Sequence, residues 1–307
     1  MKSSPRALDL GDSLTLAPPA KRGLFLGGVD GLGRFLRLSP AGALGASFLL
    51  VVLLVAIFAP LIAPYDPLAG DYAVTRQGPT LLHLLGTDDL GRDVFSRIIF
   101  GARITMLVSV TSTIIGGTIA LAWGVASGYS GGRFDMVSQR LIEVLMAFPT
   151  LILAMLLLIG MNAGIQPVII AIAVTQVPGC TRIVRSAALT TRTLAYVEAA
   201  RCLGASPRRI MFREIAPQCV APFLVVLTLN LGSAIFAEAG LSFLGVGIPP
   251  PTPSWGNMLG GVLAAAFRPS WWLVLFPGVA ITLTVMAVNI FGDALRDFLD
   301  PRIKRQV

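Results

Sequence analysis

The sequence predicts an all-α, polytopic membrane protein that crosses the bilayer with six helices. Hydrophobic residues make up 55% of the chain, charged residues only 13%, and the mean hydropathy is +0.79. Such a composition is unlike that of a soluble globular domain. The apolar residues also occur in uncharged runs long enough to cross a hydrocarbon core of about 30 Å. One membrane domain is therefore expected.

The first transmembrane helix is expected at residues 41–63, which carry no charge. Residues 1–40 hold six Lys and Arg residues with scattered Pro and Gly, and they contain no apolar segment typical of a signal peptide. They are expected to form a mobile N-terminal tail. Residues 64–103 are expected to form a long outer loop. The second helix then begins at Ile104 and ends near Gly128, where Gly-Tyr-Ser-Gly-Gly predicts a turn.

The third and fourth helices lie in one long apolar stretch of the predicted core, residues 104–293. Residues 144–181 lack charge over a length too great for one ordinary crossing. Polar and helix-breaking residues at 160–167 divide this stretch. The third helix is therefore expected to begin at about residue 141, and the fourth to follow residue 167.

The fifth and sixth helices are expected at residues 221–244 and 271–292, with an irregular Pro-rich stretch at 249–253 between them. Residues 294–307 then form a C-terminal tail. With both tails in the cytoplasm, 19 of the 24 Lys and Arg residues fall on inner segments and five on outer ones. Because cytoplasmic loops carry the excess of positive charge, this split predicts a multi-pass protein of the bacterial inner membrane with both termini inside.

The sequence predicts no catalytic, cofactor or metal site in this chain. It lacks the Gly-x4-Gly-Lys-Ser/Thr phosphate-binding signature, so any ATP that drives the protein binds to another chain. The single histidine argues against a His-based metal site or a Ser/His/Asp triad, and the cysteines form no Cys-x-x-Cys pair. The lysines, the histidine and the cysteines are Lys2, Lys21, Lys304, His83, Cys180, Cys202 and Cys219.

Two alternatives from other classes are a nucleic-acid-binding protein and a pore or transporter without an ATPase. The basic residues are spread over several loops rather than gathered on one face with stacking aromatics, which argues against nucleic-acid binding. A pore or a secondary transporter without an ATPase stays open as an alternative. A proton relay usually needs ionisable residues inside the membrane, and here few charges lie within or beside the expected helices: Glu143, Arg182, Arg185, Glu238 and Asp293.

The loop between the fourth and fifth helices, residues 194–217, carries the most informative local pattern. Residues 194–203 have a helix-forming composition, and Gly204 can adopt the left-handed conformation that ends a helix. Ser206 and Pro207 fit an N-cap followed by proline at the first helical position. The loop is therefore expected to be a helix, a turn and a second short helix.

Three apolar residues stand in this basic loop. Ile210, Met211 and Phe212 lie among arginines at positions 208, 209 and 213, which suits insertion into a groove of a partner protein. The alternative is an interfacial helix that lies on lipid headgroups.

The spacing Glu198-Ala199-Ala200, then Gly204, then Pro217 resembles the EAA loop by which ABC importer permeases dock on their ATP-binding subunits. The rest of the chain resembles the C-type permease of the dipeptide/oligopeptide transport family, from Leu85 to Arg302. The matching segments include Leu85-Gly86-Thr87-Asp88, Gly101-Ala102-Arg103, Gly128-Tyr129, Phe148-Pro149, Leu241-Ser242-Phe243-Leu244-Gly245, Pro253-Ser254-Trp255-Gly256 and Asp300-Pro301-Arg302.

The resemblance implies a type I ABC importer permease fold and transport by alternating access. It also implies a second, B-type permease, two ATP-binding subunits that hold ATP and Mg²⁺, and an outer solute-binding protein. The solute implied is a peptide, with nickel or glutathione as alternatives. The residues expected to couple the permease to the ATPase are Glu198, Ala199, Ala200, Gly204, Ser206, Pro207, Arg208, Ile210, Phe212 and Pro217.

An outer gate is expected at the outer end of the fifth helix, over residues 238–247. An acidic residue deep in a membrane span needs a polar partner or water, so Glu238 is expected to face the second permease rather than lipid. Phe243 and Trp255 are expected on the same side, toward the solute-binding protein. A structural hydrogen bond from Glu238 to a neighbouring helix is an equally open alternative.

Overall fold

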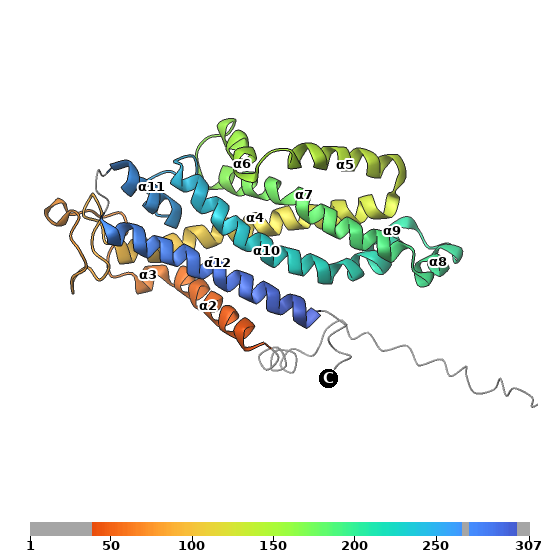
Figure 1. The fold of residues 1–307 in the computed structure, drawn as a ribbon, viewed down its shortest axis with the longest axis horizontal. Helices are drawn as coiled ribbons and strands as arrows, with labels where there is room; N and C mark the ends of the chain where they lie inside the picture. Colours follow the sequence, from red (N-terminus) through yellow and green to blue (C-terminus); the bar gives the residue numbers. More distant parts are fainter. Residues whose placement is uncertain (1–38, 266–269, 300–307) are drawn as a thin grey trace, which may run out of the picture.

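The protein is an elongated bundle of long α-helices, seen in a computed structural model that describes residues 39–265 and 270–299 (Figure 1). Within these described residues, five helical stretches are long and apolar enough to cross a membrane, and a bent pair brings the number to six if it crosses as one span. The elements are α2 (Pro40–Ile57), α3 (Ala59–Ile62), η1 (Tyr72–Val74), α4 (Val94–Ser130), α5 (Gly132–Met146), α6 (Thr150–Ile159), α7 (Ile165–Arg192), α8 (Ala195–Cys202), α9 (Pro207–Arg209), the π-helix η2 (Ile210–Ile215), α10 (Ala216–Phe243), α11 (Trp255–Ala265) and α12 (Trp271–Leu299).

The helix that contains the second predicted span begins at Val94 rather than Ile104, so the last residues of the predicted outer segment 64–103 are helical. Asp93 caps α4: its carboxylate accepts hydrogen bonds from the backbone N–H and the hydroxyl of Ser96, both at 2.8 Å. The 37 residues of α4 span roughly 55 Å, which is well beyond the thickness of the hydrocarbon core. Part of α4 therefore extends outside the membrane.

The third predicted helix is two helices, α5 and α6, bent by 91° at a short break. The break falls at Pro149, which precedes α6 and has an extended ψ of 137°. Proline has no N–H to donate and disfavours helical geometry in the residue before it, so a single helix cannot continue through this point. The two helices differ in character, because α5 carries four charged residues in its 15 positions, whereas α6 carries none.

The last two predicted helices also have different ends in the structure. α9, η2 and α10 form one helical stretch, Pro207–Phe243, so the helix that contains the fifth predicted span begins within the loop. α12 continues to Leu299, so the first part of the predicted C-terminal tail, residues 294–299, is helical. The rest of that tail and residues 1–38 of the predicted N-terminal tail lie outside the described residues. Residues 249–253 are irregular as predicted, but α11 follows them and was not anticipated.

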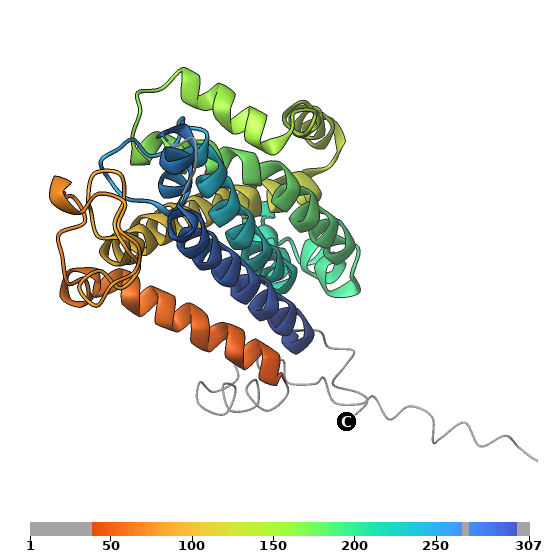
Figure 2. The ribbon, with the colours of Figure 1, turned by 60° about the vertical axis from the view of Figure 1, so that its left-hand side comes forward.

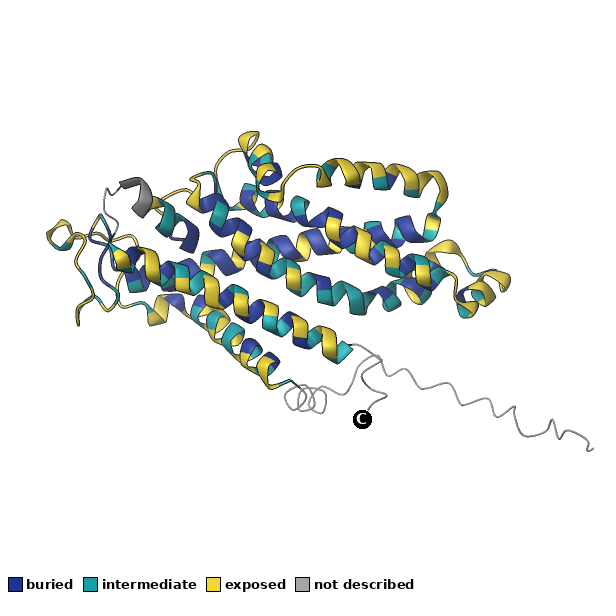
Figure 3. Cartoon of the chain, in the orientation of Figure 1, coloured by how far each residue is buried: buried dark blue, intermediate teal, exposed yellow. Residues whose placement is uncertain are grey.

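The centre of the bundle is the pair α4 and α7, with α10 packed across both. α2 packs on α12 and α4 along one flank, while α5 and α6 lie along the opposite flank (Figure 2). Glycines allow the close approach of the central pair. An added Cβ at Gly124 or Gly128 would lie 2.7 Å from the Cβ atoms of Val184 and Ala188. Figure 3 shows buried residues concentrated on this central pair and exposed ones on α2, α5 and α12.

Candidate coupling loop and outer gate

The loop after α7 has the predicted helix, turn and short helix. α8 ends at Cys202, and Gly204 follows with a left-handed φ of +77°. The N–H of Ala205 donates to the carbonyl of Ala200 at 3.0 Å, which satisfies one of the free carbonyls at the helix end. Ser206 then caps α9, because its hydroxyl accepts from the N–H of Arg209 at 3.4 Å, and Pro207 takes the first helical position.

Most of the predicted coupling residues lie on the surface of this loop. The exposed ones are Glu198, Ala199, Gly204, Ser206, Pro207, Arg208 and Phe212, while Ala200 and Pro217 are half-buried. Phe212 is 72% exposed, and Leu203, at the tip of the turn, is 88% exposed. The loop lies at the end of the bundle opposite the segment 63–93 (Figure 1). It therefore presents two large apolar side chains beyond the helices.

Ile210 is the exception, and its predicted place among exposed apolar residues is wrong. It is 1% exposed and belongs to the apolar cluster that also holds Val184, Val197 and Cys219. Residues two apart on a helix point in nearly opposite directions, so Phe212 faces outward when Ile210 faces the bundle. Ile210 is thus an anchor of the loop rather than part of its exposed surface.

Polar contacts join the loop to the end of α4. The guanidinium of Arg201 lies over the ring of Tyr129, 5.4 Å from its centroid. Arg192, at the end of α7, donates to the carbonyls of Gly128 and Tyr129 at 3.0 and 3.3 Å. These carbonyls belong to the last turn of α4, where they have no intrahelical partner. These contacts tie the end of α7 and the loop to the last turn of α4.

α5 is held against α7 by an ion pair near the same end. The guanidinium of Arg185 donates through two nitrogens to the two carboxylate oxygens of Asp135. The hydroxyl of Ser127, on α4, donates to the same carboxylate. Such forked pairing fixes geometry as well as distance. The sequence gives no sign of this contact, because Asp135 and Arg185 are 50 residues apart and no local pattern links them.

The predicted outer gate is buried within this chain. Glu238 is 0% exposed, and its carboxylate accepts hydrogen bonds from the hydroxyls of Thr105 at 2.9 Å and Ser242 at 2.8 Å. The prediction that Glu238 faces a second permease is therefore wrong, and the alternative of a hydrogen bond to a neighbouring helix holds. Trp255 is also buried, and its indole N–H donates to the carbonyl of Ile98. Phe243 alone is surface-exposed, at 40%.

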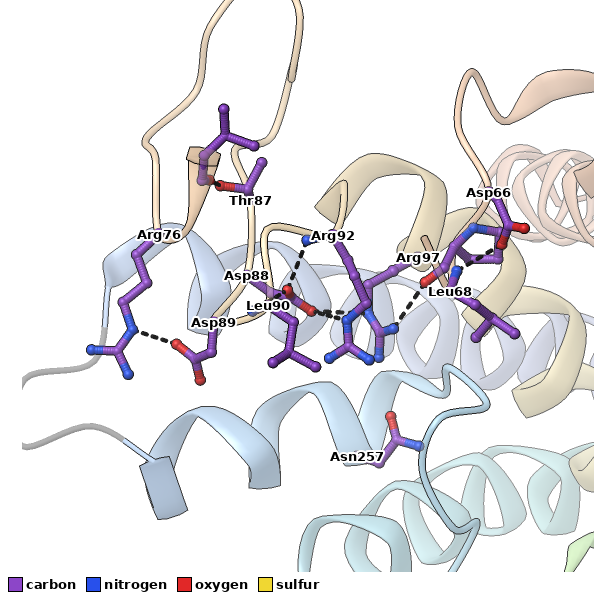
Figure 4. Close-up of polar contacts among 12 residues, drawn as sticks. Asp66, Leu68, Arg76, Thr87, Asp88, Asp89, Leu90, Arg92, Arg97 and Asn257 are labelled. Carbon is purple, nitrogen blue, oxygen red and sulfur yellow. Dashed lines mark hydrogen bonds and ion pairs between the residues drawn. The ribbon is translucent and has the colours of Figure 1, made fainter. Parts of the chain in front are cut away.

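The segment 63–93 is fixed by a network around Asp88 (Figure 4). Its carboxylate accepts from the backbone N–H groups of Leu90 and Arg92 at 2.9 Å and from Nε of Arg92 at 2.7 Å. Nε of Arg97 lies 3.5 Å from the same carboxylate, and Nη1 of Arg97 donates to the carbonyl of Pro67. The segment is therefore an ordered cap on the bundle.

Comparison with known proteins identifies the family. Residues 120–305 match the model of the binding-protein-dependent transport system inner membrane component, and residues 33–79 match the N-terminal transmembrane domain of oligopeptide transport permease C. A putative peptide transport system permease protein of Brucella abortus is 43% identical over 267 residues, which cover 86% of this chain and 88% of that protein.

Two further relatives have more specific names. The di/tripeptide transport system permease protein DppC of Pseudomonas aeruginosa is 41% identical over 86% of this chain and 89% of its own length. The glutathione transport system permease protein GsiD of Escherichia coli is 42% identical over 84% of this chain and 86% of its own length.

The fold also matches a solved structure. An inward-facing structure of the MetNI methionine ABC transporter aligns with a TM-score of 0.57 and 19% identity, over 67% of this chain and 97% of the matched chain. With the family matches, this likeness makes the chain a membrane-embedded permease component of an ABC transporter. The chain belongs to the family of binding-protein-dependent transport system inner membrane components, with the N-terminal domain of the oligopeptide permease C subunits.

Proposed function

We propose that this chain is the C-type permease of an ATP-driven importer that moves short peptides or glutathione across the bacterial inner membrane. The names of the relatives support both solutes equally, since DppC and GsiD match at nearly the same identity. Nickel is the remaining alternative within the family. The chain performs no chemistry on the solute: binding energy and alternating access suffice.

The exposed loop 194–217 docks on an ATP-binding subunit. The observation that carries this proposal is the pair of apolar tips at Leu203 and Phe212, which protrude from a loop rich in arginine at one end of the bundle. Such a tip fits a groove on a partner protein. The positive-charge split supports a cytoplasmic location for this end, where ATP is available.

A second, B-type permease completes the path. The described interior of this chain is packed with small and branched apolar side chains between α4, α7 and α10, which leaves the solute to pass along a surface shared with a partner. An outer solute-binding protein delivers the solute to the end capped by the segment 63–93. Two ATP-binding subunits, which carry ATP and Mg²⁺, drive the cycle from the cytoplasm.

The test is uptake by vesicles that contain the complete complex, with the solute-binding protein outside and ATP supplied at the ATPase. Labelled tripeptide and labelled glutathione are the probes. Uptake of at least one of them that requires both ATP and the binding protein is expected. Uptake that proceeds without ATP would support the alternative of an ATPase-independent transporter and overturn the proposal.

A matched pair of variants isolates the loop. Phe212→Asp places a charge on the exposed tip and is expected to release the ATP-binding subunits while the two permeases stay together. Leu81→Asp makes a matching change at an exposed position of the segment 63–93, at the opposite end of the bundle. Loss of the ATP-binding subunits in both variants, or in neither, would contradict the docking role of the loop.

A further inference from the structure

An apolar groove opens between α2 and α4 near the end of the bundle that carries the segment 63–93. It is a cavity of about 350 Å³ whose walls include Leu53, Ile57 and Leu107. These side chains are 42, 57 and 51% exposed. Exposed aliphatic side chains on both walls of a membrane-facing groove suit an acyl chain.

A second cavity of about 620 Å³ lies beside the groove and is more polar. Its lining includes Pro60, Tyr65, Asp66 and Pro253, which belong to the segments that leave the membrane. Arg103 lines both cavities. One arginine therefore marks the boundary between an apolar groove and a polar cavity, as a phosphate marks the boundary between the tails and the headgroup of a lipid.

Arg103 is exposed and makes no ion pair or hydrogen bond with any residue that the structure describes. Two arginines nearby differ: Arg92 and Arg97 both contact Asp88. Arg103 lies nine residues after the start of α4, roughly 14 Å along a helix of roughly 55 Å. That position corresponds to the edge of a hydrocarbon core of about 30 Å rather than to its centre.

The second charge of the polar cavity is the carboxylate of Asp66. It accepts a hydrogen bond from the N–H of Leu68 at 2.8 Å, which fixes its orientation (Figure 4). No ion pair joins Asp66 to Arg103 among the described contacts, although both line the same cavity. The cavity thus offers a cation and an anion that are held apart.

We propose that this site binds phosphatidylethanolamine. One acyl chain lies in the groove between α2 and α4, the phosphate pairs with Arg103, and the primary ammonium group pairs with Asp66. The glycerol headgroup of phosphatidylglycerol offers Asp66 hydroxyl donors but no positive charge, and the quaternary ammonium of phosphatidylcholine cannot donate a hydrogen bond to it. The charge pattern therefore favours phosphatidylethanolamine over phosphatidylglycerol and phosphatidylcholine.

The experiment measures which lipids stay bound to the purified full-length chain with the subunits that accompany it. The complex is equilibrated with equal amounts of phosphatidylethanolamine, phosphatidylglycerol and phosphatidylcholine, and retained lipids are counted by native mass spectrometry. The variants are Arg103→Gln, Arg103→Lys and Asp66→Asn. The matched control is Arg182→Gln, because Arg182 is an exposed arginine of α7 remote from both cavities in the fold.

Arg103→Gln is expected to lower retention of all three lipids about fivefold, since a basic residue near the membrane surface contributes about 1 kcal/mol. Arg103→Lys is expected to keep most of the binding. Asp66→Asn is expected to remove the preference for phosphatidylethanolamine while phosphatidylglycerol is retained as well as before or better. Arg182→Gln is expected to leave all three unchanged, and each variant is checked for an unchanged melting temperature.

Three results would overturn the proposal. One is equal retention of phosphatidylethanolamine by the wild type and Arg103→Gln. Another is a wild type that shows no preference among the three lipids. The third is release of an accompanying subunit by Arg103→Gln with lipid retention unchanged, which would make Arg103 a contact to a protein.

Discussion

Gly204 combines a left-handed backbone, which glycine adopts without strain, with open space around its Cα atom. Its φ is +77°, and an added Cβ would meet no atom within 4 Å in this chain. A side chain at this position therefore costs only the backbone strain, about 1 kcal/mol, unless a partner lies against it. Gly204→Asp is expected to assemble with the second permease but to lose the ATP-binding subunits or ATP-dependent uptake, both measured on the purified complex.

Gly204→Ala is the matched control. It carries at least as much backbone strain, because aspartate adopts the left-handed region more readily than alanine does. Its side chain is too short to reach far into a partner's surface, so most of the coupling should survive. If the alanine variant fails as severely as the aspartate variant, strain in the turn rather than collision with the ATPase explains the loss. If both variants take up solute normally, the coupling role of Gly204 is wrong.

Variants of Glu238 distinguish a structural role of this buried carboxylate from a role in gating. Glu238→Leu leaves the hydroxyls of Thr105 and Ser242 without their acceptor and should cost about 1–3 kcal/mol. Glu238→Gln keeps one acceptor oxygen and should lower the melting temperature of the purified complex less than the leucine variant does. Normal uptake by the glutamine variant would support a structural role, whereas lost uptake at an unchanged melting temperature would restore a role in gating.

Single residues were predictable where the signal is local. Gly204, Ser206 and Pro207 follow from the chemistry of helix ends, which needs only adjacent residues. Ile210 and Glu238 were misplaced because burial depends on which helices pack against them. An apolar residue in a basic loop can be either exposed to a partner or buried against the bundle, and the sequence allows both. Only the packing of the π-helix η2 against the bundle decides which one applies.

At the scale of elements, the Asp135–Arg185 pair should hold α5 to α7. The variants Asp135→Asn, Arg185→Gln and the double variant form a thermodynamic cycle, read from melting temperatures of the purified complex. A coupling energy in the range of about 0.5–3 kcal/mol is expected for residues in direct contact. Arg140 and Glu143, an exposed pair within α5, provide the control, because exposed pairs contribute at most about 1 kcal/mol. An equal coupling energy in the two pairs would contradict the role of the Asp135–Arg185 pair in holding α5 to α7.

The existence of the helices was more predictable than their ends. Each apolar run contains a helix, since only hydrogen-bonded helices or closed barrels cross a bilayer. The start of α4 was missed because the charges at 92–103 resemble a loop, although Asp93 is an N-cap. The bend between α5 and α6 was missed because length and hydropathy do not distinguish a straight span from a broken one.

For the whole molecule, the charge split predicts that the loop 194–217 lies inside the cell and the segment 63–93 outside. The test is cysteine labelling of intact cells after replacement of Cys180, Cys202 and Cys219. Asp88 is a poor reporter, because it is 9% exposed and hydrogen-bonded. Leu81, at 98% exposure, is the better outer site, and Ser206 is the inner one. Labelling of Ser206→Cys but not Leu81→Cys by an impermeant reagent would reverse the orientation.

The glycine-mediated contact between α4 and α7 has a mechanical consequence. Two helices whose backbones touch along much of their length behave as one stiff beam, because neither can bend without opening the contact. This beam is attached to the loop 194–217 at one end and ends beneath the cap at Asp93 at the other. A displacement of the loop would then tilt the pair α4 and α7 as one rigid body about its middle. For a rod of roughly 55 Å, a tilt of about 10° displaces each end by roughly 5 Å in opposite directions, so that closing one side of the membrane and opening the other become a single motion.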